Sequence, residues 1–322
     1  MAKEAKQTIN GKAFEYALLK EFLERLQIVT SVSIVENDPY NTALKCFLSF
    51  SEKEQSHYTL VASFAVNFLI DIEPRLSNGI SNKDILQLEI VSDKEGQTGD
   101  VRDVLAIRSL QKWEIGVSAK NNHRAVKHSR LSLDIDFGQK WLGIPNSKIY
   151  FSEITPVFSF LQEIKSEDKN AKWSSVGNKS NDVYVPILNA FKKELEKLNK
   201  ENPDTVPGKL VKYLIGSNDF YKIIKGKNKV EIHAFNLYGS LNQALNENKP
   251  KAKVTKVKLP DRLIEVVFKN NSKTTLLITL NEGWQFSCRI HSAKSTIETS
   301  LKFDINLIST PHSLFTNQLF IS

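Results

Sequence analysis

Two apolar segments, Val101–Arg108 and Trp113–Asn121, follow each other with only a short turn between them, and they constrain the fold more than any other feature. Their β-branched and aromatic residues favour strands, and so short a connection predicts an antiparallel hairpin. A turn centred within the connection pairs Asp103 with Ser118 and places Asp103 and Lys120 on one face. A shift of one residue in the register would place them on opposite faces.

The hydrophobic pattern elsewhere predicts an α+β chain whose C-terminal third is rich in strands. Phe14, Leu18, Phe22 and Leu26 recur every four residues, which is the spacing of an amphipathic helix. Further helices are expected within the apolar run 58–72 and over 124–131, 155–165, 183–200 and 207–216. Further strands are expected over 29–35, 45–50, 85–91, 148–154, 230–237, 263–269, 274–280, 285–291 and 301–308.

Composition limits the class of protein. The chain has 322 residues, so it forms one large domain or two. Hydrophobic residues make up 41% and charged residues 25%, which is typical of a globular protein and excludes wholesale disorder. Cys46 and Cys288 form neither a disulfide framework nor a zinc-binding pattern, which fits a reducing compartment.

Membrane insertion and export are not predicted. The most apolar run, Tyr58–Ile72, contains Asn67 and Asp71 and is too short to span a bilayer. The first residues lack the apolar stretch of a signal peptide, so we expect a cytoplasmic protein with no membrane partner. The motifs GxxxxGK[ST], GxGxxG and HExxH are absent, which argues against a nucleotide cofactor or a zinc protease.

Asp103 and Lys120 are the side chains of the expected hairpin that can carry chemistry. A carboxylate can hold Mg²⁺, which prefers oxygen ligands, and the metal can polarise a phosphate. A neighbouring lysine can position a water and offset the charge that develops on the phosphate. The pair therefore suits phosphodiester hydrolysis. On spacing alone, a structural ion pair on a solvated face explains the same two residues.

The surroundings of this pair resemble a known family of nucleases. Asp103, the apolar residues after it and Lys120 on the next strand are similar to the PD-(D/E)xK nuclease core. The start of the first helix, Asn10–Glu15, is similar to the Gly-x-x-Phe-Glu helix of many members. The resemblance implies a central mixed sheet flanked by helices, followed here by a β-rich C-terminal region.

Further motifs resemble type II restriction endonucleases, most of all those of the HaeIII type. They lie at 120–123, 127–132, 136–138, 283–286, 289–293 and 300–304. Members of this type cut GGCC in double-stranded DNA in a Mg²⁺-dependent reaction. The resemblance therefore implies a sequence-specific endonuclease of a prokaryotic cytoplasm, with Mg²⁺ as cofactor, that leaves 5′-phosphates.

The resemblance also implies a role for each residue of the site. Asp103 would bind the metal and Lys120 would orient the attacking water. The superfamily pattern has Asp or Glu two residues before the lysine, where this sequence has Ser118. Serine is a poor Mg²⁺ ligand, so a second carboxylate has to come from elsewhere. The candidates are Glu15 in the first helix and, after the basic segment, Asp134 and Asp136; we rank Glu15 first and Asp134 second.

The net charge of +8 favours a polyanionic partner if the basic residues are concentrated. They gather between Lys112 and Arg130, directly after the hairpin, and again around Arg289. An arginine that donates two hydrogen bonds to guanine is the commonest base-specific contact, so we expect Arg289 to read the target. The candidate DNA contacts are Asn122, His123, Arg124, Lys127, His128, Arg130, Arg289, His291 and Lys294.

Each basic group also has a structural explanation. The segment after the hairpin would equally form a solvated basic face, and the lysines between Pro250 and Pro260 a solvated loop. Arg289 would equally pair with Glu282 or Glu298.

Three consecutive regions are expected. They are a nuclease core over 1–165 with an insertion at about 27–84, a helical connection over 166–225, and a β-rich DNA-recognition region over 226–322. Two other functions fit the same residues, a non-catalytic DNA-binding module and a repair or junction nuclease of the same fold. The sequence leaves the oligomeric state open, a homodimer included.

Overall fold

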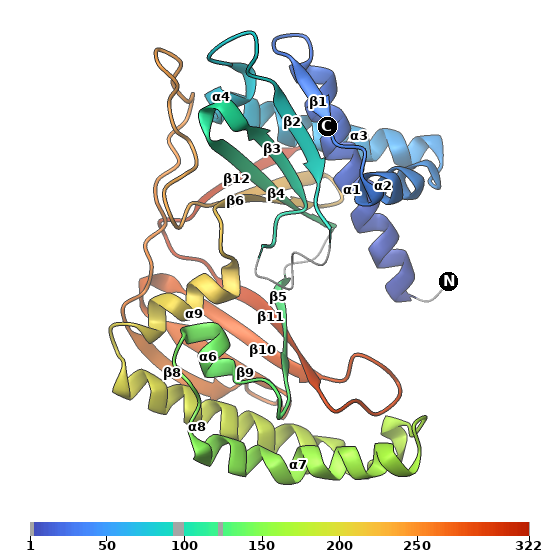
Figure 1. Cartoon of the computed structure of the whole chain (residues 1–322), viewed down its shortest axis with the longest axis vertical. Coiled ribbons are helices and arrows are strands. Elements are labelled where there is room, and N and C mark those ends of the chain that lie inside the picture. The colour runs from blue at the N-terminus through green and yellow to red at the C-terminus, as the bar shows by residue number, and fades with distance from the viewer. Residues whose placement is uncertain (1–2, 93–99, 122–124, 322) are drawn as a thin grey trace. The chain divides into compact units, whose positions relative to one another are not determined.

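Figure 1 shows the computed structural model, which describes residues 3–92, 100–121 and 125–321. The chain divides into two compact units, each built from separate stretches of sequence. The first unit contains Met1–Arg124, Gly216–Val257 and Ser313–Ser322, and the second contains Ala125–Ile215 and Lys258–His312. Among the helices of these described stretches, none is long and apolar enough to cross a membrane.

The first unit is built on a mixed sheet of seven strands in the order β1-β2-β3-β4-β6-β7-β12. The pairs β1/β2 and β4/β6 are parallel and the other neighbours are antiparallel. The strands are β1 (Val32–Ile34), β2 (Leu86–Ile90), β3 (Val104–Arg108), β4 (Trp113–Asn121), β6 (Phe220–Lys225), β7 (Lys229–Phe235) and β12 (Phe315–Phe320). The mixed sheet and its helices confirm the α+β class.

Helices of the first unit pack against this sheet and against each other. They are α1 (Lys3–Leu26), α2 (Asp38–Leu48), α3 (Glu52–Ile72) and α4 (Pro74–Ser77). The apolar stripe of α1 is buried as predicted, and α1 packs against α2, α3 and β4 (Figure 1). The helix expected within 58–72 is α3, which begins at a capping box between Ser51 and Glu54.

The second unit contains an antiparallel sheet of five strands in the order β5-β11-β10-β9-β8, and helices pack against this sheet. Its strands are β5 (Ala125–Leu131), β8 (Leu263–Phe268), β9 (Thr275–Leu280), β10 (Gln285–His291) and β11 (Leu301–Ser309), and its helices are α6 (Phe137–Leu142), α7 (Lys148–Glu167), α8 (Val185–Glu201) and α9 (Val206–Ile215). Phe303 of β11 packs edge-on against Phe191 of α8, with ring centroids 5.2 Å apart. Lys302 and Asp304, its neighbours along the strand, lie on the opposite, polar face.

The basic piece 124–131 was expected to be helical, and this prediction is wrong. Its described part is β5, which pairs antiparallel with β11 from Leu131↔Leu301 to Ala125↔Asn306. The partner strand lies far along the chain, so no local pattern reveals the pairing. Because side chains alternate along a strand, Lys127 and Arg130 point to opposite faces of the sheet.

The segment 148–154 was expected to be a strand, and it forms the start of α7. The Ser147 hydroxyl caps this helix by accepting the backbone N–H of Tyr150. The buried residues Tyr150, Ile154 and Leu161 recur at helical spacing. A helix was expected over 155–165, with Pro156 in its first turn. Pro156 instead lies inside α7. Consecutive apolar residues at 149–151 imitate a buried strand, because both structures can bury such a run.

The pattern also missed two strands of the first sheet, β6 and β12. All residues of β6 are buried, so it lacks the alternation that marks a half-exposed strand. Residues 45–48 end α2 and do not form the expected strand. Because β6, β7 and β12 complete the first sheet, the two units differ from the three consecutive regions expected over 1–165, 166–225 and 226–322.

Candidate active site

The β3–β4 hairpin has the register that the sequence predicts. Val104 pairs with Val117, and the strands are joined by a short helical turn that Lys112 closes in the left-handed region with φ 49°. One step beyond the last pair, the backbone N–H of Asp103 donates to the Val117 carbonyl at 2.8 Å. This places Asp103 beside Ser118 at the open end of the hairpin.

The Asp103 carboxylate collects three donors from β4. Its Oδ2 accepts the backbone N–H of Ala119 at 2.7 Å, the Lys120 ammonium at 3.1 Å and the Ser118 hydroxyl at 3.3 Å. Oδ1 receives none of these bonds. Ser118 is buried, whereas the side chains of Asp103 and Lys120 are 21% and 28% exposed. The hairpin therefore brings the three predicted residues together and leaves two of them open to solvent or substrate.

Glu15 joins this site from α1, which packs against β4. Its side chain is buried, and Lys12, one helical turn earlier, donates to Oε2 at 3.0 Å. Burial raises the pKa of Glu15 to about 7, and the negative charge of Asp103 adds to the rise. Lys12 and Lys120 act in the opposite direction and lower this pKa. Glu15 is therefore close enough to Asp103 for the charge of Asp103 to raise the pKa of Glu15.

These two carboxyl groups fit a hard divalent cation. A cation relieves the repulsion between neighbouring carboxylates, and Mg²⁺ is commonly bound by one or two carboxylates, with waters and substrate phosphate as further ligands. Over 3–92, 100–121 and 125–321, no group of three or more His, Cys, Asp or Glu residues is arranged to hold a metal. Asp134, the other candidate ligand, is an exposed turn residue of the second unit.

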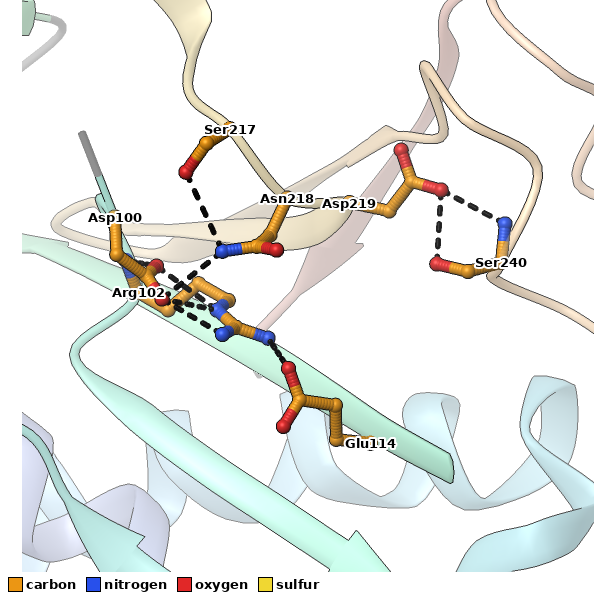
Figure 2. A network of polar contacts seen from close by, with 7 residues as sticks. All are labelled: Asp100, Arg102, Glu114, Ser217, Asn218, Asp219 and Ser240. Atoms are coloured by element: carbon orange, nitrogen blue, oxygen red, sulfur yellow. Dashed lines mark hydrogen bonds and ion pairs between the residues drawn. The ribbon is translucent and has the colours of Figure 1, made fainter. Parts of the chain in front are cut away.

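A network of ion pairs anchors the chain just before Asp103 (Figure 2). The Arg102 guanidinium lies between two carboxylates and donates to Asp100 at 2.6 Å and to Glu114 of β4 at 2.6 Å. Asn218, which precedes β6, donates to the same Asp100 carboxylate at 3.1 Å. Because Arg102 directly precedes Asp103, this network holds the backbone from which the Asp103 carboxylate projects.

Of the DNA contacts expected directly after the hairpin, the structure describes the side chains of Lys127 and Arg130. Asn122, His123 and Arg124 lie outside the described residues, as does the side chain of His128. Lys127 is packed into the second unit. Its ammonium lies 3.7 Å from the centre of the Tyr213 ring and donates to the Tyr213 carbonyl at 2.7 Å. Burial lowers the pKa of Lys127 to about 8.

Arg130 lies on the polar face of the second sheet. It is exposed and donates to the Ser300 hydroxyl at 2.8 Å. Its guanidinium also lies 3.5 Å from Glu298.

Arg289 and His291 of β10 lie on the same polar face of the sheet, whereas Trp284 and Phe286 are buried. The Arg289 side chain is 57% exposed and donates to Asp304 at 2.9 Å. Its acidic partner is therefore neither Glu282 nor Glu298, the two expected from the sequence. Lys294 lies in the exposed turn after β10.

Sequence reasoning missed three groups of the site, namely Lys12, Arg102 and the backbone N–H of Ala119. Lys12 could have been found, because it lies three residues before Glu15 and such pairs meet on a helix. The contacts of Arg102 depend on tertiary structure, and a backbone donor has no signature in a sequence.

Comparison with known proteins identifies the family. No solved structure matches the chain. The family model described as HaeIII restriction endonuclease matches residues 11–311. The type II restriction enzyme HaeIII of Haemophilus aegyptius is 42% identical over 312 residues, which cover 96% of each chain. The chain therefore belongs to the HaeIII restriction endonuclease family and is a type II site-specific endodeoxyribonuclease that acts on double-stranded DNA.

Proposed function

We propose that this enzyme cuts GGCC in double-stranded DNA in a Mg²⁺-dependent reaction that leaves 5′-phosphates. The observation that supports the chemistry most directly is the meeting of Asp103, Ser118 and Lys120 beside the buried Glu15. The GGCC target rests on the resemblance to the HaeIII type.

Asp103 and Glu15, both of the first unit, would hold the metal, whereas Asp134 of the second unit stays a prediction from the sequence. Type II restriction enzymes generally use a divalent metal ion. When bound, Mg²⁺ supplies positive charge that stabilises the negative charge developing on the scissile phosphate. Each carboxyl contributes an oxygen of the kind that Mg²⁺ prefers.

Lys120 would act on the attacking water. Its ammonium is held 3.1 Å from the Asp103 carboxylate, so it lies next to the proposed metal position. From there it would orient the water and offset charge on the phosphate in the transition state. Ser118 fills the place of the missing acid and donates to Asp103 at 3.3 Å, which makes it a partner of the metal ligand and not itself a ligand.

We assign the first unit to the PD-(D/E)xK type. Its α1, the antiparallel strands β2 to β4 and the parallel neighbour β6 have the kinds of elements expected of that core. The expected recognition region would then be the second sheet, where Arg289 and His291 would contact bases. Arg130 and Lys294 would contact phosphates, as would Asn122, His123, Arg124 and His128. Lys127 is a weaker candidate because its ammonium is already bound to Tyr213.

A homodimer in a prokaryotic cytoplasm completes the proposal. GGCC reads the same on both strands, and a two-fold symmetric dimer would offer one active site to each strand.

Digestion of a plasmid of known sequence tests the proposal. With Mg²⁺, the wild-type chain should give discrete bands that match the GGCC map, and a chelator should abolish them. Lys120→Ala should bind the same DNA and cut it at least about a hundredfold more slowly, since it removes a transition-state contact. Lys193→Ala, at an exposed lysine of α8, is the matched control.

Two results would favour the other functions. A smear without discrete bands would indicate a nuclease of the same fold without strict sequence specificity. Intact plasmid together with a gel shift would contradict catalysis and leave a DNA-binding module.

A further inference from the structure

The polar face of the second sheet carries a cluster of charged side chains around Asp304. Arg289 of β10 is paired directly with Asp304 of β11, and His291 is paired with Lys302. Because paired residues point to the same side and alternate along each strand, all four side chains share one face. None of the roles described above uses Asp304.

Among the side chains that the structure describes, three basic ones reach Asp304. Arg289 donates from Nη2 to Asp304 Oδ2 at 2.9 Å. The His291 ring nitrogen Nε2 lies 2.8 Å from the same oxygen, as a close contact without the alignment of a hydrogen bond. The Lys302 ammonium is 3.7 Å from Oδ1. The Asp304 carboxylate is 16% exposed, so its bonds are better shielded from water than those of a fully exposed ion pair.

This contact determines what the Arg289 side chain can do. An arginine on an exposed sheet face loses conformational freedom when it binds a base, and that loss weakens the contact. A bond to Asp304 restricts the side chain before DNA arrives. The guanidinium carries five N–H donors, and Asp304 engages Nη2, so donors remain for an acceptor pair such as guanine O6 and N7.

We propose that Asp304 is a positioning residue for base readout, which orients the Arg289 guanidinium toward the guanines of the target. The inference rests on the proposed GGCC specificity. It assigns to β11 a share in recognition, although Asp304 itself need not touch a base.

Competition binding of the full chain tests this role. Ca²⁺ replaces Mg²⁺ to suppress cutting, and the duplexes carry either GGCC or a site with one G·C pair changed. Asp304→Asn keeps the shape of the side chain and removes its charge. We expect it to lower the preference for GGCC about tenfold, the size of a weakened arginine–guanine contact. Glu265→Gln removes an exposed carboxylate from β8 of the same sheet and should leave the preference unchanged.

A second pair of chains shows whether Asp304 acts through Arg289. In an Arg289→Ala background, adding Asp304→Asn should cause no further loss of preference. A further loss of equal size would overturn the inference, because Asp304 would then act independently of Arg289.

The remaining outcomes are also decisive. If wild type prefers GGCC and Asp304→Asn keeps that preference, the inference is wrong and the proposed function stands. An equal loss of affinity for every duplex would assign Asp304 a structural role and also contradict the inference. If wild type shows no preference for GGCC, the proposed specificity fails and this inference fails with it.

Discussion

At the scale of single residues, Glu15 has the most consequential surroundings. Its carboxyl group is buried next to a second carboxylate, and its pKa is raised to about 7. Near neutral pH, protonated and ionised Glu15 are therefore both populated. A proton and a metal ion would compete for the same oxygens, since a carboxylate must be deprotonated to bind a metal.

This competition predicts a pH-dependent metal requirement. The Mg²⁺ concentration for half-maximal cleavage should fall about tenfold between about pH 6 and about pH 8, as expected for one competing proton with this pKa. Measuring the half-saturating Mg²⁺ concentration separates this effect from any pH dependence of the attacking water. Glu15→Gln should need more Mg²⁺ and lose the pH dependence, whereas Glu24→Gln on the same helix should behave like wild type. A wild-type requirement that stays flat over this range would contradict the role of Glu15.

Glu73 is a second buried carboxyl group, and its effect is on stability. Its Oε1 accepts the Tyr221 hydroxyl at 2.6 Å and the Asn242 N–H at 2.7 Å, and burial raises its pKa to about 7. A carboxyl group whose pKa is raised in the folded state stabilises the fold fully at a pH below its unfolded pKa of 4.5. This stabilisation is lost as the pH rises through the folded pKa of about 7.

Glu73→Gln removes this titratable group, so the variant should not lose stability through it as the pH rises. Relative to wild type, the free energy of unfolding of the variant should improve by about 1 kcal/mol per pH unit between these two pKa values. Urea unfolding at about pH 5 and about pH 8 measures the difference. Glu265→Gln, at an exposed site, should show no such change, and an equal effect of Glu73→Gln at both pH values would rule out the raised pKa.

At the scale of elements, local patterns predicted those parts of the fold whose contacts are local. The β3–β4 hairpin follows from two apolar runs joined by a short turn, and α1 follows from four-residue spacing. The register of the hairpin brought Asp103 to Lys120. β5 was mistaken for a helix because its strand character comes from pairing with β11. β6 was missed because a strand buried on both faces has no alternation.

The same division applies to the candidate site. Asp103, Ser118 and Lys120 could be placed from the hairpin, and Glu15 entered through the resemblance of its helix to a known family. The resemblance implied that Glu15 lies at the metal site with Asp103. Its burial there could not be predicted, because this depends on how α1 packs on the sheet.

The anchoring of Asp103 depends on a glycine in the neighbouring strand. A Cβ at Gly116 would lie 2.0 Å from Arg102 Cδ, so only glycine lets Arg102 cross β4 to reach Glu114. Gly116→Ala should therefore displace Arg102 and lower the free energy of unfolding by about 1–3 kcal/mol.

A double-mutant cycle isolates this contact. Arg102→Ala removes the clashing side chain, so Gly116→Ala should cost much less in that background than in wild type. Urea unfolding of the four chains gives the coupling energy. Additive effects would show that Gly116 does not serve to accommodate Arg102.

At the scale of the whole molecule, the net charge of +8 has an experimental consequence. Binding to DNA releases counterions, so affinity should fall steeply with salt, by about a thousandfold or more between about 50 and 200 mM if six or more phosphates are contacted. Arg130→Ala should reduce the slope of the salt dependence by about one if it contacts a phosphate, and Lys193→Ala should not. Gel-shift titrations over this range measure the slope, and a salt-independent affinity would contradict electrostatic binding.

The sheet that carries Asp103 and Lys120 is assembled from stretches separated by the whole of 125–215 and, again, by 258–312. During synthesis the hairpin therefore emerges from the ribosome long before β6, its parallel neighbour, and longer still before β12. Pairings between such distant segments form slowly. A nascent chain would thus contain the residues for cleaving DNA well before it contains the sheet that holds them in place, and nuclease activity would begin only after β12 has been synthesised.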